Sequence, residues 1–289
     1  MYYLIFGILY LISLLPFFIL YILSDVLYVL VWKFLRYRKN VTYNNLKLSF
    51  PEKSDEEINL IMNKYYRNLC DSVVETIKLM SASQRSLDKR MTCNWEVFDS
   101  MTLQNRNGQG FMSHQFNWEM GTVLCNWHSP RRFTGLYMPL NNRYFERLFL
   151  YIRGRSGTKL IRVQDMQKEL SETQNQQVLW GFIADQNPSD PKRVSWNDFF
   201  HRKTAFFKGP EFVARRYNNL VYFGEFVKLK RGYYEIKMKL AFDNPRETKE
   251  GEITEAYVRF LEASIKRQPE NWVWSHRRWK HSYPTTSSS

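Results

Sequence analysis

The chain has 289 residues, of which 44% are hydrophobic, and its 42 Lys and Arg outnumber 28 Asp and Glu to give a formal net charge of +14. This length can bury one substantial core. The excess charge indicates an acidic partner, and three classes fit: nucleic acid, an anionic membrane face, and a soluble acidic protein or phosphorylated lipid. The three cysteines form no CxxC pair, which argues against a disulfide framework and a structural zinc site.

The N-terminal segment is strongly apolar. Residues 1–24 contain no charged side chain, and the apolar run continues to Trp32 with only Asp25 interrupting it. A helix needs roughly 20 residues to cross the hydrocarbon layer, so residues 1–32 are predicted to be a membrane anchor. A secretory signal is disfavoured because no basic stretch precedes the run and no small-x-small cleavage site follows it.

The orientation of this anchor follows from the basic residues after it. Lys33, Arg36, Arg38 and Lys39 come directly behind the apolar run, so the positive-inside rule places the body of the protein in the cytoplasm. Asp25 is expected near the interface or against protein, because a carboxylate is unfavourable at the bilayer centre. Pro16 leaves a bent or monotopic anchor open, and a buried core helix is the alternative.

Downstream, the pattern predicts a helical segment over 40–90. Ser54 and Glu57 have the spacing of a capping box, and apolar residues at helical intervals follow, so a helix is expected from about 55 to 80. Strands are expected at 178–184, 220–227 and 233–242, with a turn at Arg231-Gly232. Helices are expected at 210–216 and 252–267.

Strands interleaved with helices indicate an α/β fold, which we predict as a mixed central sheet flanked by helices, with the N-terminal membrane-anchoring helix in front. Residues 33–282 would form this domain, and 283–289 a disordered tail.

His114 and Glu119 are the centre of the functional prediction. Five residues on a continuous helix separate side chains by about 140°, so the two meet only if His114 precedes a helix that begins near Glu119. A histidine held by a carboxylate is a general-base arrangement. Taken alone, the pair is a weak signal, because most pairs with this spacing are accidental or contain a hydrogen-bonded surface histidine. Cys125 and His128, three apart, are a weaker candidate pair for thiol chemistry.

The residues around this pair resemble the lipid A biosynthesis late acyltransferases, the lauroyl and myristoyl transferases of the lysophospholipid acyltransferase superfamily. The family's phrase His-x-x-Asn-Trp-Glu is matched by His114, Asn117, Trp118 and Glu119. Other segments resemble the family in the same order, although Met138 and Arg143 depart from its pattern. They are 44–52, 137–144, 151–157, 184–186 and 269–280.

The resemblance implies roles for individual residues. His114 would be the base and Glu119 its orienting partner. Arg153 would bind a phosphate or carbonyl of a substrate, with Asp185 positioning Arg153 or the acceptor. Asn117 and Arg155 complete the predicted substrate-binding set. Without the resemblance, it is equally open that Arg153 and Arg155 are ordinary solvated charges, and a turn or N-cap role is the alternative for Asp185. We expect His128 and His276 to be structural, and Arg277 and Arg278 to be membrane-surface or structural residues rather than catalytic ones.

The implied reaction transfers a fatty acyl chain from acyl-carrier protein to a hydroxyl of a lipid A precursor, giving an acyloxyacyl product. The partners would be acyl-carrier protein, a phosphorylated glycolipid acceptor and anionic lipids of the bacterial inner membrane, with the catalytic domain on the cytoplasmic side. No cofactor or metal is implied, and nucleic acid is disfavoured because the basic residues are dispersed. The alternatives are an acyltransferase for a lysophospholipid or aminoacyl lipid, and a non-catalytic basic membrane adaptor.

Overall fold

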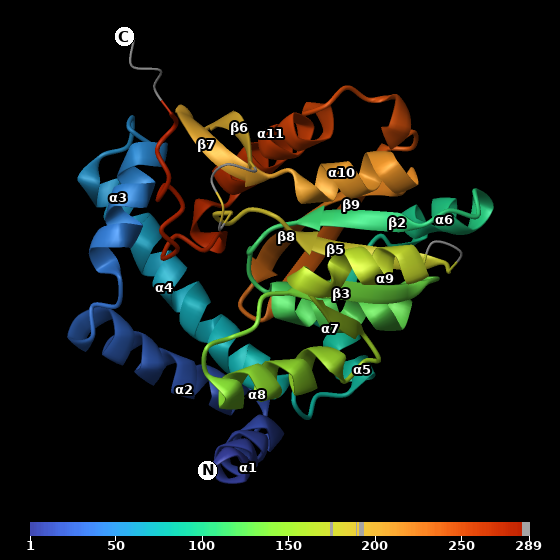
Figure 1. Cartoon of the computed structure of the whole chain (residues 1–289). Coiled ribbons are helices and arrows are strands. Elements are labelled where there is room, and N and C mark those ends of the chain that lie inside the picture. Colours follow the sequence, from blue (N-terminus) through green and yellow to red (C-terminus); the bar gives the residue numbers. More distant parts are fainter. Residues whose placement is uncertain (174–175, 189, 191–193, 285–289) are drawn as a thin grey trace.

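A mixed seven-stranded sheet forms the centre of the computed structural model, which describes residues 1–173, 176–188, 190 and 194–284 (Figure 1). Its order is β1-β9-β8-β2-β5-β3-β4. β2 runs parallel to β5 and β8, whereas β8 and β9 are antiparallel. The bounds are β1 (Met91–Cys93), β2 (Gly108–Met112), β3 (Arg132–Tyr137), β4 (Lys159–Arg162), β5 (Val178–Ile183), β8 (Leu220–Lys230) and β9 (Tyr233–Phe242). The predicted mixed α/β class is confirmed.

Helices cover both faces of this sheet. In Figure 1, α10 and α11 lie on one side, and α5, α7 and α8 on the other. A small antiparallel pair, β6 (Val194–Phe199) and β7 (Arg202–Phe207), lies near α11 and was not predicted. The helices behind the N-terminal segment are α3 (Lys39–Ser49), α4 (Asp55–Lys78), α5 (Gln84–Asp88), α6 (Asp99–Leu103), α7 (Trp118–His128), α8 (Arg143–Gly154), α9 (Met166–Glu172), α10 (Gly209–Tyr217) and α11 (Glu252–Arg267).

The elements with strong local signals begin and end close to where the sequence places them. The predicted capping box is present, because the Ser54 hydroxyl accepts from the Glu57 N–H and the Glu57 carboxylate accepts from the Ser54 N–H. β9 matches its predicted range, and α10 begins with Pro210 in its first turn. β8 continues to Lys230, past the predicted end at 227, because its pairing with β9 persists to the turn at Arg231-Gly232.

The N-terminal segment is two helices rather than one. α1 (Tyr2–Leu14) ends before Pro16, and α2 (Phe17–Val29) begins after it and continues into a π-helical turn, Leu30–Phe34. Proline lacks the N–H that would continue the helix, which accounts for the break. Within the described residues, the stretch Phe17–Phe34 is long and apolar enough to cross a membrane.

One face of α2 packs along α4. Asp25 accepts hydrogen bonds from Arg231 at 2.8 and 3.1 Å. It therefore lies against protein, which is one of the two placements that the sequence analysis allowed. Ser24 also donates to Asp71 of α4 at 2.8 Å. The opposite face of α2 is apolar and exposed. It carries Phe18, Ile22, Leu23, Val26 and Val29.

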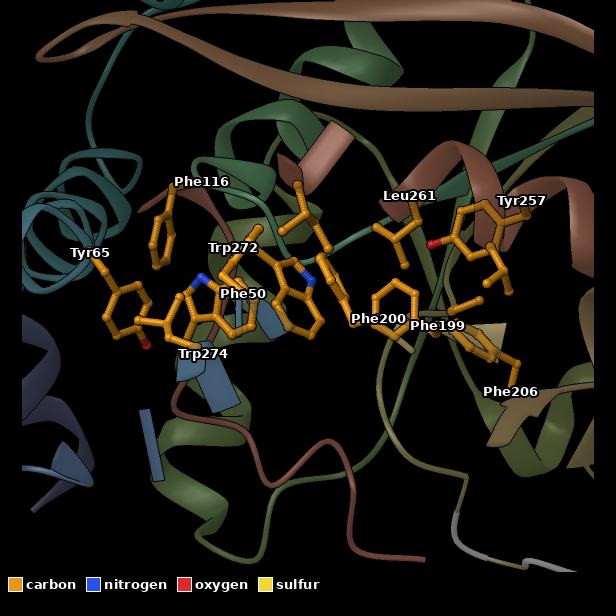
Figure 2. Close-up of a cluster of buried hydrophobic side chains, with 14 of the residues drawn as sticks. Phe50, Tyr65, Phe116, Phe199, Phe200, Phe206, Tyr257, Leu261, Trp272 and Trp274 are labelled. Atoms are coloured by element: carbon orange, nitrogen blue, oxygen red, sulfur yellow. The ribbon is translucent and has the colours of Figure 1, made fainter. Parts of the chain in front are cut away.

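A row of buried aromatic side chains connects α4 to α11, and two of its members come from the C-terminal segment (Figure 2). Tyr65 of α4 lies at one end and Tyr257 of α11 at the other. Trp272 and Trp274 lie between them, edge to face with ring centroids 4.8 Å apart. Each ring buries a large apolar area, so the row fixes the C-terminal segment firmly against the domain.

Candidate active site

The site begins where two parallel strands end side by side. β2 and β5 are neighbours with Met112 opposite Ile183. His114 follows β2 by two residues and Asp185 follows β5 by two residues, so both emerge at the same edge of the sheet. Ligands of open α/β sheets commonly bind outside the carboxyl ends of the strands, which makes this edge the place to look for chemistry.

His114 is held there by Asp185. The imidazole Nδ1 lies 2.6 Å from the Asp185 Oδ1, and the His114 backbone N–H donates to Oδ2 at 2.9 Å. The indole N–H of Trp272 donates to the same Oδ2 at 2.7 Å. Burial alone would raise the pKa of the Asp185 carboxyl, but the His114 charge and these hydrogen bonds outweigh it and lower that pKa below its usual value.

The predicted contact between His114 and Glu119 is wrong. His114 precedes α7 and Glu119 lies in its first turn, as the sequence analysis required, yet the Glu119 carboxylate binds Arg153. Arg153 Nε donates to Oε2 at 2.7 Å and Nη2 to Oε1 at 2.5 Å, a bidentate ion pair. Asp185 was expected to position Arg153 or the acceptor. The two carboxylates have therefore exchanged partners relative to the prediction.

Trp118 connects these two ion pairs. Its ring lies edge to face with the His114 imidazole at 5.2 Å between centroids, and its indole N–H donates to Glu119 Oε1 at 3.2 Å. Both carboxylates are almost fully buried, whereas the side chains of His114 and Arg153 are 20% and 26% exposed. The arrangement therefore presents one imidazole and one guanidinium cation to the outside, each supported by a carboxylate that is almost fully buried.

The remaining predicted substrate-binding residues have structural contacts. Asn117 is fully buried and caps α7, because its Oδ1 accepts from the Met120 N–H and its Nδ2 donates to Glu75 at 2.8 Å. Arg155 donates to the backbone oxygen of Leu79. The first contacts occupy the Asn117 amide, so Asn117 holds the start of α7 in place. The second ties the end of α8 to the end of α4, and a substrate-binding role for Arg155 stays a prediction.

The weaker chemical candidates are accounted for by their surroundings. Burial raises the pKa of the Cys125 thiol to about 12, and His128 binds Asp88 at 2.7 Å, which disfavours a thiolate mechanism. Burial also lowers the pKa of His276 to about 4. Arg278 is buried and donates to Ala205 O, a structural role as predicted. Across the described parts of the chain, no three His, Cys, Asp or Glu side chains gather as metal ligands.

Sequence reasoning missed two residues that support the site. Trp272 was noted only as part of a resemblance, but its indole N–H and its place in the aromatic row fix Asp185 (Figure 2). Glu75 was not singled out at all. Its buried carboxylate accepts from Tyr21 of α2 and Asn117 of α7 and from Tyr234 of β9, at 2.9, 2.8 and 2.8 Å. The signal that could have identified Glu75 is the presence of a glutamate on the buried face of α4.

Replacing Glu75 by Gln should preserve folding and flatten the pH dependence of stability. Burial raises the pKa of Glu75 despite the Asn117 hydrogen bond. The stabilisation of the folded state that Glu75 contributes is therefore complete below about pH 4.3 and is lost as the pH rises through the pKa of Glu75 in the folded protein. A glutamine oxygen can accept from Asn117 and Tyr234 while its amide donates to the Tyr21 hydroxyl, without the charge. The measurement is Tm at about pH 5 and about pH 8 for both proteins.

The matched variant Glu75→Leu should behave differently. It leaves three donors without an acceptor, each worth about 1–3 kcal/mol when buried, and Tm should fall at every pH. A Glu75→Gln protein as unstable as Glu75→Leu would contradict this account of the network.

Comparison with known proteins identifies the family. Residues 1–281 match the family model described as bacterial lipid A biosynthesis acyltransferase. The chain is 24% identical over 280 residues to the lipid A biosynthesis lauroyltransferase of Escherichia coli K12, covering 95% of this chain and 89% of that protein. It is also 24% identical over 278 residues to the lipid A biosynthesis palmitoleoyltransferase of the same organism, with the same coverage. An edge-of-sheet site with an imidazole on a buried carboxylate and a match across nearly the whole chain together place this protein among the bacterial lipid A biosynthesis acyltransferases.

Proposed function

We propose that this enzyme transfers a fatty acyl chain from acyl-carrier protein to a hydroxyl group of a lipid A precursor, with His114 as the general base. The observation that carries the proposal is the hydrogen bond between His114 Nδ1 and the buried Asp185. When Nδ1 donates to a carboxylate, the proton is kept off Nε2, which is then free to accept the proton of a substrate hydroxyl.

The chemical step uses this free nitrogen. The hydroxyl oxygen attacks the carbonyl carbon of the thioester as its proton passes to His114 Nε2. The resulting tetrahedral intermediate collapses by breaking the carbon–sulfur bond, and the proton passes from His114 to the departing thiolate of the carrier. Asp185 stabilises the imidazolium that exists between these events. The substrate hydroxyl is itself the nucleophile, so no acyl-enzyme is required.

Arg153 is proposed to bind an oxyanion of the substrates. Its Nε and Nη2 are held by Glu119, whereas Nη1 has no hydrogen-bond partner among the described residues. Glu119 thus fixes the guanidinium plane and leaves one N–H edge available for a phosphate or for the developing negative charge on the thioester oxygen. In this proposal Glu119 acts through Arg153, and Asp185 takes the orienting role predicted for Glu119.

The setting is proposed to be the cytoplasmic face of the bacterial inner membrane. Support comes from the exposed apolar face of α2, from the basic residues that follow it and from the net charge of +14. Positive charge favours both anionic lipids and an acidic carrier protein. In terms of organisation, residues 1–32 would be the anchor and 33–282 the catalytic domain.

The test is a product assay. The purified full-length protein is incubated with acyl-carrier thioester and, separately, with a lipid A precursor, a lysophospholipid or an aminoacyl lipid, and the products are weighed by mass spectrometry. We expect the mass of one acyl chain to be added to the lipid A precursor at a hydroxyl of an existing acyl chain. If only the lysophospholipid or the aminoacyl lipid is acylated, the proposed acceptor is wrong. If no acceptor is acylated, acyl-carrier protein is wrong as the proposed donor.

A further inference from the structure

A basic pocket lies beside α2, where it meets α4, the β8–β9 turn and the segment after α11. Its volume is about 330 Å³. That is the space of roughly ten water molecules at about 30 Å³ each, which accommodates a phosphate with part of its alcohol. Neither His114 nor Arg153 lines it, so it is separate from the candidate active site. Its cations are Lys64, Arg67, Lys228, Lys230 and Arg231.

The carboxylates of this pocket neutralise only part of that charge. Five cations line it against three carboxylates, those of Asp25, Asp71 and Glu270. Arg231 bridges Asp25 and Asp71, with one N···O distance of 2.8 Å to each. Lys228 is held by the Asn68 amide oxygen at 2.7 Å and lies 3.4 Å from Asp71. The buried Asp71 carboxylate contacts both Lys228 and Arg231, and with the half-exposed Asp25 it fixes these two cations in place.

Lys64 and Lys230 remain available to a ligand, and the Lys230 ammonium also lies 4.4 Å from the centroid of the Tyr233 ring. Among the described residues, neither Lys64 nor Lys230 has a carboxylate within ion-pair distance, and both are exposed. Lys64, Arg67 and Asp71 occupy the same face of α4 because they are spaced three, four and seven residues apart. Arg67 lies over the Tyr28 ring of α2 at 4.4 Å, so the cationic face is continuous with the apolar helix.

One exposed apolar side chain lines the pocket, and other exposed apolar side chains lie close to Asp25 along α2. Leu229 in the lining is 59% exposed, and Ile22 and Val26, which flank Asp25 on α2, are 59% and 55% exposed. A soluble phosphate gains nothing from these apolar side chains. A membrane lipid carries acyl chains as well as a phosphate. The cationic pocket suits the phosphate, and the exposed aliphatic side chains beside the pocket suit the acyl chains.

We propose that this pocket binds the phosphate group of an anionic membrane lipid, with Lys64 and Lys230 as its main contacts and the lipid chains lying along α2. The bound lipid would hold α2 at the level of the headgroups. The proposal uses the membrane setting of the proposed function but not its chemistry, because the pocket contains none of the proposed catalytic residues.

The test compares vesicle binding of full-length variants. Partitioning onto phosphatidylcholine vesicles, with and without phosphatidylglycerol, is measured by sedimentation for the wild type and for Lys64→Gln/Lys230→Gln. At about 1 kcal/mol for each lysine near an anionic surface, the double variant should bind phosphatidylglycerol vesicles roughly 10- to 30-fold more weakly. The matched control, Lys203→Gln/Lys208→Gln, removes the same charge from β7 and the residue before α10, and should lose less than about twofold.

Two further results separate a lipid site from its alternatives. Equal losses in both double variants would overturn the proposal in favour of diffuse attraction. Calorimetric binding of inorganic phosphate that disappears in Lys64→Gln/Lys230→Gln, with vesicle binding unchanged, would show a free-phosphate site and overturn the lipid assignment. Acyl transfer to a detergent-dispersed acceptor should be unchanged in this variant, so failure here is distinguishable from failure of the proposed function.

Discussion

Replacing His114 by Asn is expected to lower kcat for acyl transfer by about 10²- to 10⁴-fold, the usual contribution of a general base. The asparagine Nδ2 occupies nearly the position of the imidazole Nδ1, so it can still donate to Asp185, which lies 2.6 Å from Nδ1 in the present structure. What the variant lacks is Nε2, the atom proposed to receive the hydroxyl proton. The measurement is the single-turnover rate with acyl-carrier thioester and the lipid A precursor.

The choice of asparagine separates chemistry from folding. Alanine at position 114 would leave Asp185 as a buried carboxylate without its main partner, which is a destabilising change in its own right. His114→Asn should keep Tm within a few degrees of the wild type and should leave vesicle binding unchanged. Wild-type turnover in a folded His114→Asn protein would move the catalytic base elsewhere and would favour the non-catalytic membrane adaptor.

Replacing Asp185 by Asn is expected to lower kcat by up to about 10⁴-fold, the effect known for the equivalent change in a serine protease triad. Two N–H groups, from the His114 backbone and Trp272, donate to Oδ2. The single oxygen of an asparagine must serve these two donors, so its amide nitrogen faces His114 Nδ1. That amide N–H donates a hydrogen bond to Nδ1, which places the imidazole proton on Nε2 and removes the free base.

Glu119→Gln is the matched comparison, because it makes the same carboxylate-to-amide change in the other ion pair. It weakens the support of Arg153 but leaves the His114–Asp185 contact intact, so we expect a smaller loss of kcat and a normal His114 tautomer. The tautomer can be read from the nitrogen chemical shifts of the His114 ring in both variants. If Glu119→Gln, and not Asp185→Asn, shifts the tautomer, the orienting role belongs to Glu119 and the exchange of partners seen in the structure does not describe the working enzyme.

The same contacts explain why the C-terminal segment belongs to the active site. Trp272 lies more than eighty residues after Asp185 in the chain, yet its indole N–H donates to the carboxylate that holds His114, the proposed base. The aromatic row secures that indole through Trp274 and Phe199 (Figure 2). A rigid support of this kind keeps a general base in one orientation, which is what preorganised catalysis requires.

Much of the fold could be predicted from the sequence because its causes are local. The Ser54–Glu57 box starts α4, alternation gives β9, and the Arg231-Gly232 turn separates β8 from β9. The residues of the candidate site were also named from the sequence, through the phrase around His114 and its resemblance to a family. Helical and strand periodicity act over a few residues, so such features are readable without knowing what lies next to them.

Which of those residues touch was decided only by tertiary structure. His114 meets Asp185 because β5 lies next to β2, although β3 and β4 come between them in the chain. Closeness in sequence suggested Glu119 instead, because it lies only five residues after His114, and nothing local reveals that a distant strand supplies the carboxylate that His114 contacts. The docking of α2 through Asp25 and Arg231, and the basic pocket beside it, likewise depend on residues some two hundred positions apart. Sequence periodicity determines which face of an element is buried, but strand order and helix docking arise from long-range packing, which a local pattern does not contain.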